Sequence, residues 1–234
     1  MIRLALAAAL VAAGPIWVGR FASDGAPPPP WRVVRVGKAS PTAYRITTVA
    51  RVRGIEARAD GAMALLARPI AVDLAATPVL CWRWLIDAPV SGADMRSKAG
   101  DDYAARVYVT FDVPDSALSL ATRLRIALGR RLFGSAVPDA ALNYVWDNRQ
   151  PVGTRRRSAY TDRVEMIVAE TGSARAGAWV SERADIGADF ARAFGNRGRP
   201  IQLAVASDTD NTRSRARAAF ADLHFVGRTE RCAS

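Results

Sequence analysis

Short runs that alternate between apolar and polar residues follow one another from Trp31 almost to the end of the chain. Alternation with a period of two places one set of side chains on each face of a β-strand. Val79 to Asp87 is the clearest run, and its apolar set consists of Leu80, Trp82, Trp84 and Ile86. About ten or eleven such runs, bounded by turn residues, predict an all-β fold. We expect a two-sheet antiparallel sandwich of the jelly-roll type with one or two short inserted helices.

Two of the predicted strands adjoin acidic turns. Lys98 to Asp102 leads into the strand Tyr103 to Phe111, and Ser207 to Asn211 precedes the strand that ends at Phe225. We expect the two turns to meet at one end of the sandwich and to form a polar site with the polar faces of nearby strands. The candidate ligand-binding residues are Asp101, Asp102, Arg106, Tyr108, Asn143, Asp208, Asp210 and Asn211. A solvated sheet face and ordinary turn formation are the competing interpretations.

A hairpin and two helices are predicted between the strands. Asp60-Gly61 separates two alternating runs, so we expect these runs to pair as a hairpin. Between Leu118 and Phe133 leucines recur every four residues, at positions 120, 124, 128 and 132, and Gly134 follows. This spacing predicts an amphipathic helix that packs on the sandwich, with a membrane-surface helix as the alternative. Ile186 to Phe194 is predicted as a second, short helix.

The N-terminus has the layout of a secretory signal peptide. Arg3 precedes the apolar run Leu4 to Ala13, which ends in small residues, and a polyproline stretch lies at 27–30. We divide the chain into a signal peptide (1–13), a Pro-rich spacer (14–30), a single β-sandwich domain (31–228) and a C-terminal tail (229–234). We expect a periplasmic or secreted protein without a membrane span after leader cleavage. An uncleaved N-terminal anchor is the alternative.

The net charge of +11 comes almost entirely from arginine, because Lys38 and Lys98 are the only lysines. Abundant arginine beside abundant alanine fits a bias in codon composition. Since the chain shows neither an aromatic RNA-binding signature nor a helix-turn-helix pattern, we expect no specific nucleic-acid partner. Arginine clusters at 123/125, 130/131 and 155–157 could contact phosphates or anionic lipid, or could form a solvated face.

The chain has two cysteines, Cys81 and Cys232. In an oxidising compartment a disulfide between them would close a loop of about 150 residues, worth roughly 5 kcal/mol in the chain-entropy model. Alternation places Cys81 on the face opposite Trp82, where a crossing C-terminal tail would bring Cys232 within reach. Two free thiols are the alternative.

The spacing of the acidic residues can be compared with known metal-binding motifs. Asp208 and Asp210 begin like a calcium loop, but an EF-hand needs Gly and Glu where the chain has Arg213 and Ala219. A calcium site drawn from separate loops stays open, with Asp208 and Asp210 as the candidate metal ligands; calcium is the one cofactor suggested. Zinc is not expected, because a single histidine and two distant cysteines do not supply a usual ligand set.

No set of catalytic residues stands out. Any nucleophilic triad would need His224, the only histidine. A pair of aspartates could serve glycoside hydrolysis, but no feature of the sequence selects a pair. We therefore favour a protein that is not an enzyme.

Three stretches together carry a resemblance to a known family: Gly100 to Val109, Leu142 to Trp146, and Ser207 to Phe225. Their combination resembles an exported bacterial family known as domain of unknown function 3047, over about Trp31 to Val226. The resemblance implies export and brings no activity, so no catalytic residue is carried over. The final strand is more loosely similar to that of galactose-binding-like jelly rolls, in which a nearby acid often helps to hold calcium.

These features suggest an exported, non-catalytic β-sandwich that binds a carbohydrate or another cell-envelope polymer. An envelope polysaccharide hydrolase that uses paired aspartates is one alternative. An interaction protein whose arginines bind anionic partners is another.

Overall fold

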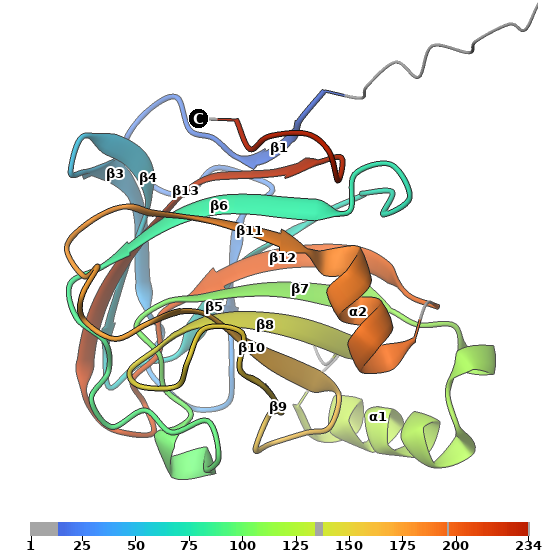
Figure 1. Ribbon diagram of the computed structural model, residues 1–234. Coiled ribbons are helices and arrows are strands. Elements are labelled where there is room, and N and C mark those ends of the chain that lie inside the picture. Colours follow the sequence, from blue (N-terminus) through green and yellow to red (C-terminus); the bar gives the residue numbers. More distant parts are fainter. Residues whose placement is uncertain (1–13, 134–137, 196, 234) are drawn as a thin grey trace, which may run out of the picture.

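Two β-sheets pack face to face in the structure, a computed structural model that describes residues 14–133, 138–195 and 197–233 (Figure 1). Sheet A has the strand order β11 (Val180–Asp185), β6 (Val79–Ile86), β13 (Arg215–Val226), β4 (Val52–Asp60) and β3 (Ala43–Val49), with β1 (Ile16–Gly19) also paired to β13. Sheet B has the order β2 (Arg32–Arg35), β5 (Ala64–Pro69), β12 (Arg199–Ala206), β7 (Arg106–Asp112), β8 (Ala140–Asp147), β10 (Val164–Thr171) and β9 (Arg155–Arg157). The expected all-β, two-sheet sandwich is confirmed.

The core lies between the two sheets. As the alternation predicts, β6 directs Trp82 and Trp84 inward, where they contact Tyr144 and Trp146 of β8. The ring centroids of Trp82 and Tyr144 lie 5.4 Å apart, and those of Trp84 and Trp146 lie 5.6 Å apart. Aromatic pairs at this spacing add to the free energy gained by burying the rings. These contacts tie the middle of sheet A to the middle of sheet B.

The fold begins earlier than the expected boundary at Trp31. β1 lies within the expected spacer and pairs antiparallel with β13, with Trp17 opposite His224. Gly25 also exchanges two backbone hydrogen bonds with Ile46 of β3. The physical reason is that β4 pairs only with the first half of β13, up to Phe220, so the second half has free backbone groups along that edge. β1 satisfies them. The expected signal peptide, 1–13, lies outside the described residues.

The expected hairpin at Asp60-Gly61 is wrong. β4 and β5 lie in different sheets, and the turn between them carries the chain from sheet A to sheet B. The hairpin in this region joins β3 to β4 through Ala50 and Arg51, both of which have positive φ angles, 44° and 68°. A two-residue turn with two positive φ angles matches the twist of antiparallel strands, even without the usual glycine.

Sheet B is mixed rather than purely antiparallel, because β10 runs parallel to β8. The segment 148–163 carries the chain back along the sheet and contributes β9, which pairs antiparallel with the outer edge of β10. Alternation of apolar and polar residues predicts which residues form a strand. The direction of a strand relative to its neighbour depends instead on the segment that connects the two strands.

The second predicted helix is present as α2 (Ile186–Phe194) and covers one end of the sandwich (Figure 1). Asp185 caps its first turn by accepting a hydrogen bond from the Ala188 amide, and Gly195 follows its last residue with a φ of 82°. Phe190 points into the core and stacks on Phe111 at a centroid distance of 4.0 Å.

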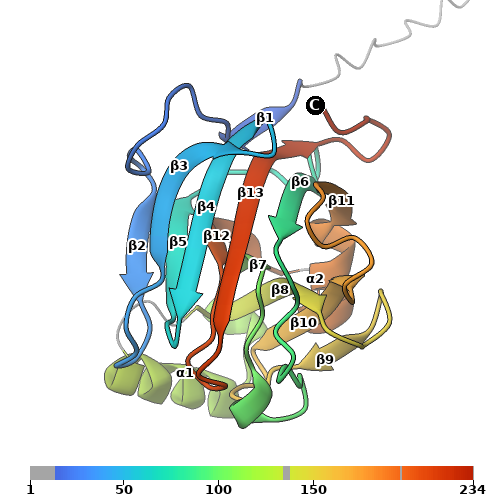
Figure 2. The ribbon, with the colours of Figure 1, turned by 90° about the vertical axis from the view of Figure 1, so that its left-hand side faces the viewer.

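The first predicted helix is also present, but its leucine face is not packed. After the short 3₁₀ turn η2 (Asp115–Ala117), α1 (Leu120–Phe133) lies at the bottom of the molecule in Figure 2. Leu120, Leu124 and Leu128 are 57–66% exposed, whereas Ile126 is buried. The expectation that the leucines pack on the sandwich is therefore wrong, because the helix turns Ile126 inward. The Leu132 side chain and the expected cap at Gly134 lie outside the described residues. Among the helices that the structure describes, none has the length and apolar character needed to cross a membrane.

Candidate functional site

The two acidic turns meet, as the sequence predicts, at the end of the sandwich where β13 begins. The loop before β13 lies beside the 3₁₀ turn η1 (Lys98–Gly100) at the bottom of Figure 2. Two backbone hydrogen bonds hold the first of these segments in place, from the Asp208 amide to the Tyr103 carbonyl and from the Thr209 amide to the Ala62 carbonyl. The ends of both sheets therefore contribute to one polar cluster.

Arg106 is the centre of the buried part of this cluster. Its Nε and Nη2 donate to the two carboxylate oxygens of Asp208 at 2.8 and 2.7 Å, and Nη2 also donates to the Asp101 carboxylate at 3.0 Å. The Tyr103 amide donates to Asp208 at 3.0 Å, and the Tyr103 ring lies under the guanidinium at 4.5 Å. Two parallel hydrogen bonds between a guanidinium and a carboxylate fix both orientation and charge. This pair locks the start of β7 to the end of β12.

The electrostatics of the pair follow from its burial. Burial by itself lowers the pKa of Arg106, but the negative charges of Asp101 and Asp208 outweigh it and hold that pKa well above its usual value. Burial raises the pKa of Asp208 to about 7, and the guanidinium of Arg106 opposes that rise. The cation of Arg106 is therefore permanent, and it compensates the buried acids.

Asp102 holds the loop before β13 in place through Asn211 and Thr212. Its two carboxylate oxygens accept four hydrogen bonds, from the backbone amide and side-chain amide of Asn211 and from the backbone amide and hydroxyl of Thr212. Asp102 is completely buried. A carboxylate with this many donors serves as the internal scaffold of a turn. It is not available as an open contact for a ligand.

Tyr160 forms the exposed edge of the cluster. The residue is 53% exposed, yet its hydroxyl donates to the Asn211 side-chain carbonyl at 2.8 Å and lies 3.3 Å from the Lys98 carbonyl oxygen. The Lys98 ammonium lies 5.2 Å from the ring centroid. Since Asn211 is itself held by Asp102, the buried network fixes an exposed aromatic ring in one orientation. Sequence reasoning missed Tyr160, because a single tyrosine in a loop has no periodicity that could mark it.

The structure brings together seven of the eight predicted ligand-binding residues: Asp101, Asp102, Arg106, Tyr108, Asp208, Asp210 and Asn211. Tyr108 follows Arg106 on the same face of β7 and interacts electrostatically with Arg106, Asp208 and Asp101. Asn143 lies opposite Tyr108 on β8. Burial raises the pKa of Tyr108 above its usual value, and the Asn143 side-chain carbonyl has no hydrogen-bond partner among the described residues. Most of the predicted surface is therefore interior. Asp210 and Asn211 are half-buried, and the exposed Tyr160 lies beside Asn211.

The same end contains a carboxylate cluster that suits a cation in its spacing. Asp102, Asp208 and Asp210 each offer an oxygen, and these oxygens lie within 4.8 Å of one another. The oxygens of Asp102 already accept hydrogen bonds from Asn211 and Thr212. Those of Asp208 accept hydrogen bonds from Arg106 and Tyr103. Calcium takes six to eight oxygen ligands in proteins, so a calcium ion here would have to compete with these hydrogen bonds.

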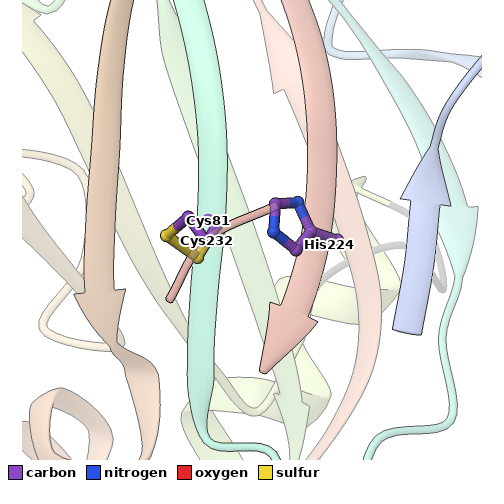
Figure 3. A group of neighbouring side chains, drawn as sticks. All are labelled: Cys81, His224 and Cys232. Carbon is purple, nitrogen blue, oxygen red and sulfur yellow. A yellow bond between two sulfur atoms is a disulfide. The ribbon is translucent and has the colours of Figure 1, made fainter. Parts of the chain in front are cut away.

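A second cluster lies on the outer face of sheet A. Cys81 of β6 and Cys232 of the C-terminal tail form a disulfide, with 5.8 Å between their Cα atoms (Figure 3). His224 of β13 lies beside it, and one of its ring nitrogens is within 4.8 Å of both sulfur atoms. The His224 Nε2 accepts a hydrogen bond from the Ala233 amide at 2.9 Å. Folding thus joins the one histidine and the two cysteines that are far apart in the sequence.

The comparison with protein families gives a match to "Protein of unknown function (DUF3047)" over residues 29–224. The chain belongs to this family. The matched region includes both acidic turns, Arg106 and Tyr160, and it contains Cys81 and His224 but ends before Cys232. The resemblance to this family seen in the sequence is confirmed. No curated protein matches the chain.

Proposed function

We propose that this protein is exported and binds a carbohydrate or another cell-envelope polymer without catalysis. The binding surface consists of the exposed Tyr160 and the half-buried Asn211 and Asp210. The observation that carries the proposal is the fixed orientation of the exposed Tyr160 ring, whose hydroxyl is held by Asn211. An aromatic ring covers the apolar C–H face of a sugar, while nearby amide and carboxylate groups bond its hydroxyls. Holding the ring rigid before binding lowers the entropy cost of association.

The position of this surface suits a polymer ligand. Tyr160 lies in the loop between β9 and β10, is 53% exposed, and contacts the loop that precedes β13. Loops on a rigid scaffold are the usual location of binding residues. The buried Arg106–Asp208 pair and the Asp102 turn supply that rigid support.

Export and the disulfide are consistent with each other. A bond between Cys81 and Cys232 persists in an oxidising compartment such as the periplasm or the exterior of the cell. This agrees with the signal-peptide pattern of residues 1–13 and supports the proposed location.

The hydrolase alternative is weaker because most of the acids near this site already accept internal hydrogen bonds. Asp101, Asp102 and Asp208 accept hydrogen bonds inside the protein, and the Asp147 carboxylate accepts from the amides of Arg149 and Gln150. A catalytic acid and base must reach the bond between two sugars. We therefore also propose that the protein acts without hydrolysis. Because the oxygens of Asp102 and Asp208 are occupied by internal donors, we propose that it acts without calcium as well.

The interaction-protein alternative also loses support, because several of its arginines are paired. Arg155 bonds Asp189, Arg157 bonds Glu165, and Arg125 bonds Asp162. Each pair removes part of the positive charge that an anionic partner would need.

The experiment is a binding assay on the purified chain with an array of bacterial envelope glycans and with peptidoglycan sacculi, at low and moderate salt. We expect binding that persists at moderate salt and is weakened in Tyr160→Ala, with no release of reducing ends. Binding that disappears at moderate salt and ignores the Tyr160 change would support the anion-binding alternative. Release of reducing ends would support the hydrolase.

A further inference from the structure

The cluster of Cys81, Cys232 and His224 has the donor set of a metal site when its disulfide is open. Two thiolates and one imidazole are ligands that Zn²⁺ prefers, and a water molecule often completes its tetrahedral shell. The two sulfurs and a ring nitrogen of His224 already lie within 4.8 Å of one another. Figure 3 shows the His224 ring of β13 beside the disulfide that joins Cys81 of the neighbouring strand β6 to Cys232 of the tail.

The hydrogen bonds of His224 fix its ring position and its tautomer, with the proton on Nδ1 and the lone pair on Nε2. Nδ1 lies 2.6 Å from the Asp222 carbonyl oxygen, so it carries the proton and donates. Nε2 is then the acceptor, and it takes the hydrogen bond from the Ala233 amide. A metal ligand needs this neutral form, in which one nitrogen donates to a carbonyl oxygen and the other carries a lone pair that can bind a metal. The Trp17 ring supports the imidazole at a centroid distance of 4.5 Å.

Access to the cluster is through the C-terminal tail. Cys81 and His224 are buried, whereas Cys232 is exposed. The tail covers the buried pair and is attached there by the disulfide and by the bond from Ala233 to His224. Opening the disulfide therefore frees both sulfurs and loosens the segment that shields the imidazole.

We propose that the reduced protein binds one Zn²⁺ ion through Cys81, Cys232 and His224. The C-terminal tail is then attached to sheet A by the disulfide in the oxidised protein and by the metal in the reduced protein. A dithiol reductant supplies two electrons and two protons, so that the disulfide becomes two thiols while the reductant becomes a disulfide. Zinc then displaces the two thiol protons and takes the Nε2 lone pair from the Ala233 amide. This inference does not depend on the proposed glycan binding.

The test is a titration of the full chain with Zn²⁺ and with Co²⁺ as a spectroscopic probe, without oxygen and after reduction with a phosphine, which competes weakly for zinc. We expect the reduced protein to bind one ion and the oxidised protein to bind none. Co²⁺ should give thiolate charge-transfer absorption that Zn²⁺ removes. His224→Gln should weaken binding by at least about 100-fold, the effect of losing one of three ligands.

Two controls separate this site from others. Cys232→Ser removes the exposed tail ligand and, as reduction does, the disulfide. It should therefore keep the fold of the reduced protein and lose the site. Asp210→Asn, in the acidic cluster, should bind zinc as the unmodified protein does. Equal zinc binding by reduced and oxidised protein, or by His224→Gln and the unmodified protein, would overturn the proposal. A reduced chain that unfolds, as seen by circular dichroism, would also overturn it, because only the fold brings the three ligands together.

Discussion

Arg106 and Asp208, 102 positions apart in the chain, form a buried ion pair through two hydrogen bonds at 2.8 and 2.7 Å. Both side chains are 3% exposed. The pair joins the first residue of β7 to the loop that follows β12, two neighbours in sheet B. The candidate site therefore stands on a junction that burial makes costly to break.

Breaking this pair from one side should be strongly destabilising. Asp208→Asn leaves the Arg106 cation buried with a weaker partner, so we expect the free energy of unfolding to fall by about 3–5 kcal/mol. The same strands supply a matched control at their other ends, where Arg199 and Asp112 form a pair that is 69% and 54% exposed. Asp112→Asn should cost about 1 kcal/mol or less. Urea unfolding of both variants measures the difference, and equal losses would show that burial of Arg106 has no energetic effect.

Glu182 should make stability depend on pH near neutrality. Burial raises its pKa from 4.5 to about 7, while the Trp84 indole donates to its carboxyl group at 3.2 Å. Because the folded pKa lies above the unfolded value, the contribution of this group is full below pH 4.5 and is lost as the pH rises to about 7.

Glu182→Gln keeps the acceptor for Trp84 and removes the titration. We therefore expect this variant to be more stable than the unmodified protein at pH 8 and to show a smaller fall in stability between pH 4.5 and 7. Urea midpoints measured across this range provide the test. The same pH slope in both proteins would contradict the assigned burial of the carboxyl group.

The two faces of α1 should respond differently to substitution. Leu124 is 63% exposed and Ile126 is 5% exposed. Leu124→Ser should change the free energy of unfolding by about 0.5 kcal/mol or less, whereas Ile126→Ala should cost about 2 kcal/mol or more. Chemical denaturation of the two variants compares them directly. A large loss for Leu124→Ser would mean that the leucine face is covered in solution.

Calcium should leave the stability unchanged. The carboxylates of Asp102 and Asp208 are saturated by internal donors, and Arg106 already supplies a cation. We expect the same melting temperature after treatment with EDTA and after addition of calcium. A ligand that binds only the folded state raises its stability. An upward shift that Asp210→Asn abolishes would therefore contradict this expectation and establish the calcium site.

Much of the fold is readable from local pattern. Trp82 and Trp84 alternate with Cys81 and Arg83, and this alternation alone predicts which face of β6 is inside. The two acidic turns are likewise recognisable, because Asp and Asn favour turns for local reasons.

Other features depend on partners that are distant in the chain. Asp60-Gly61 forms a turn as predicted, but only the pairing of β4 with β13 decides that it connects two sheets. The burial of Asp102 depends on donors 109 and 110 positions later. The contact of His224 with Cys81 and Cys232 requires β6 and β13 to be neighbours and the tail to cross them. Patterns within one stretch of sequence do not predict which distant segments become neighbours.

The most direct test of the account is the binding of Tyr160 variants to envelope glycans. In a pelleting assay with peptidoglycan sacculi, supported by the glycan array, we expect Tyr160→Ala to weaken binding by at least about tenfold. Tyr160→Phe keeps the ring and loses its bond to Asn211, so it should have an intermediate effect. Val152→Ala, at an exposed apolar position in another loop, should bind as the unmodified protein does. Undiminished binding by Tyr160→Ala, or no binding of any envelope glycan by the unmodified protein, would contradict the proposed function.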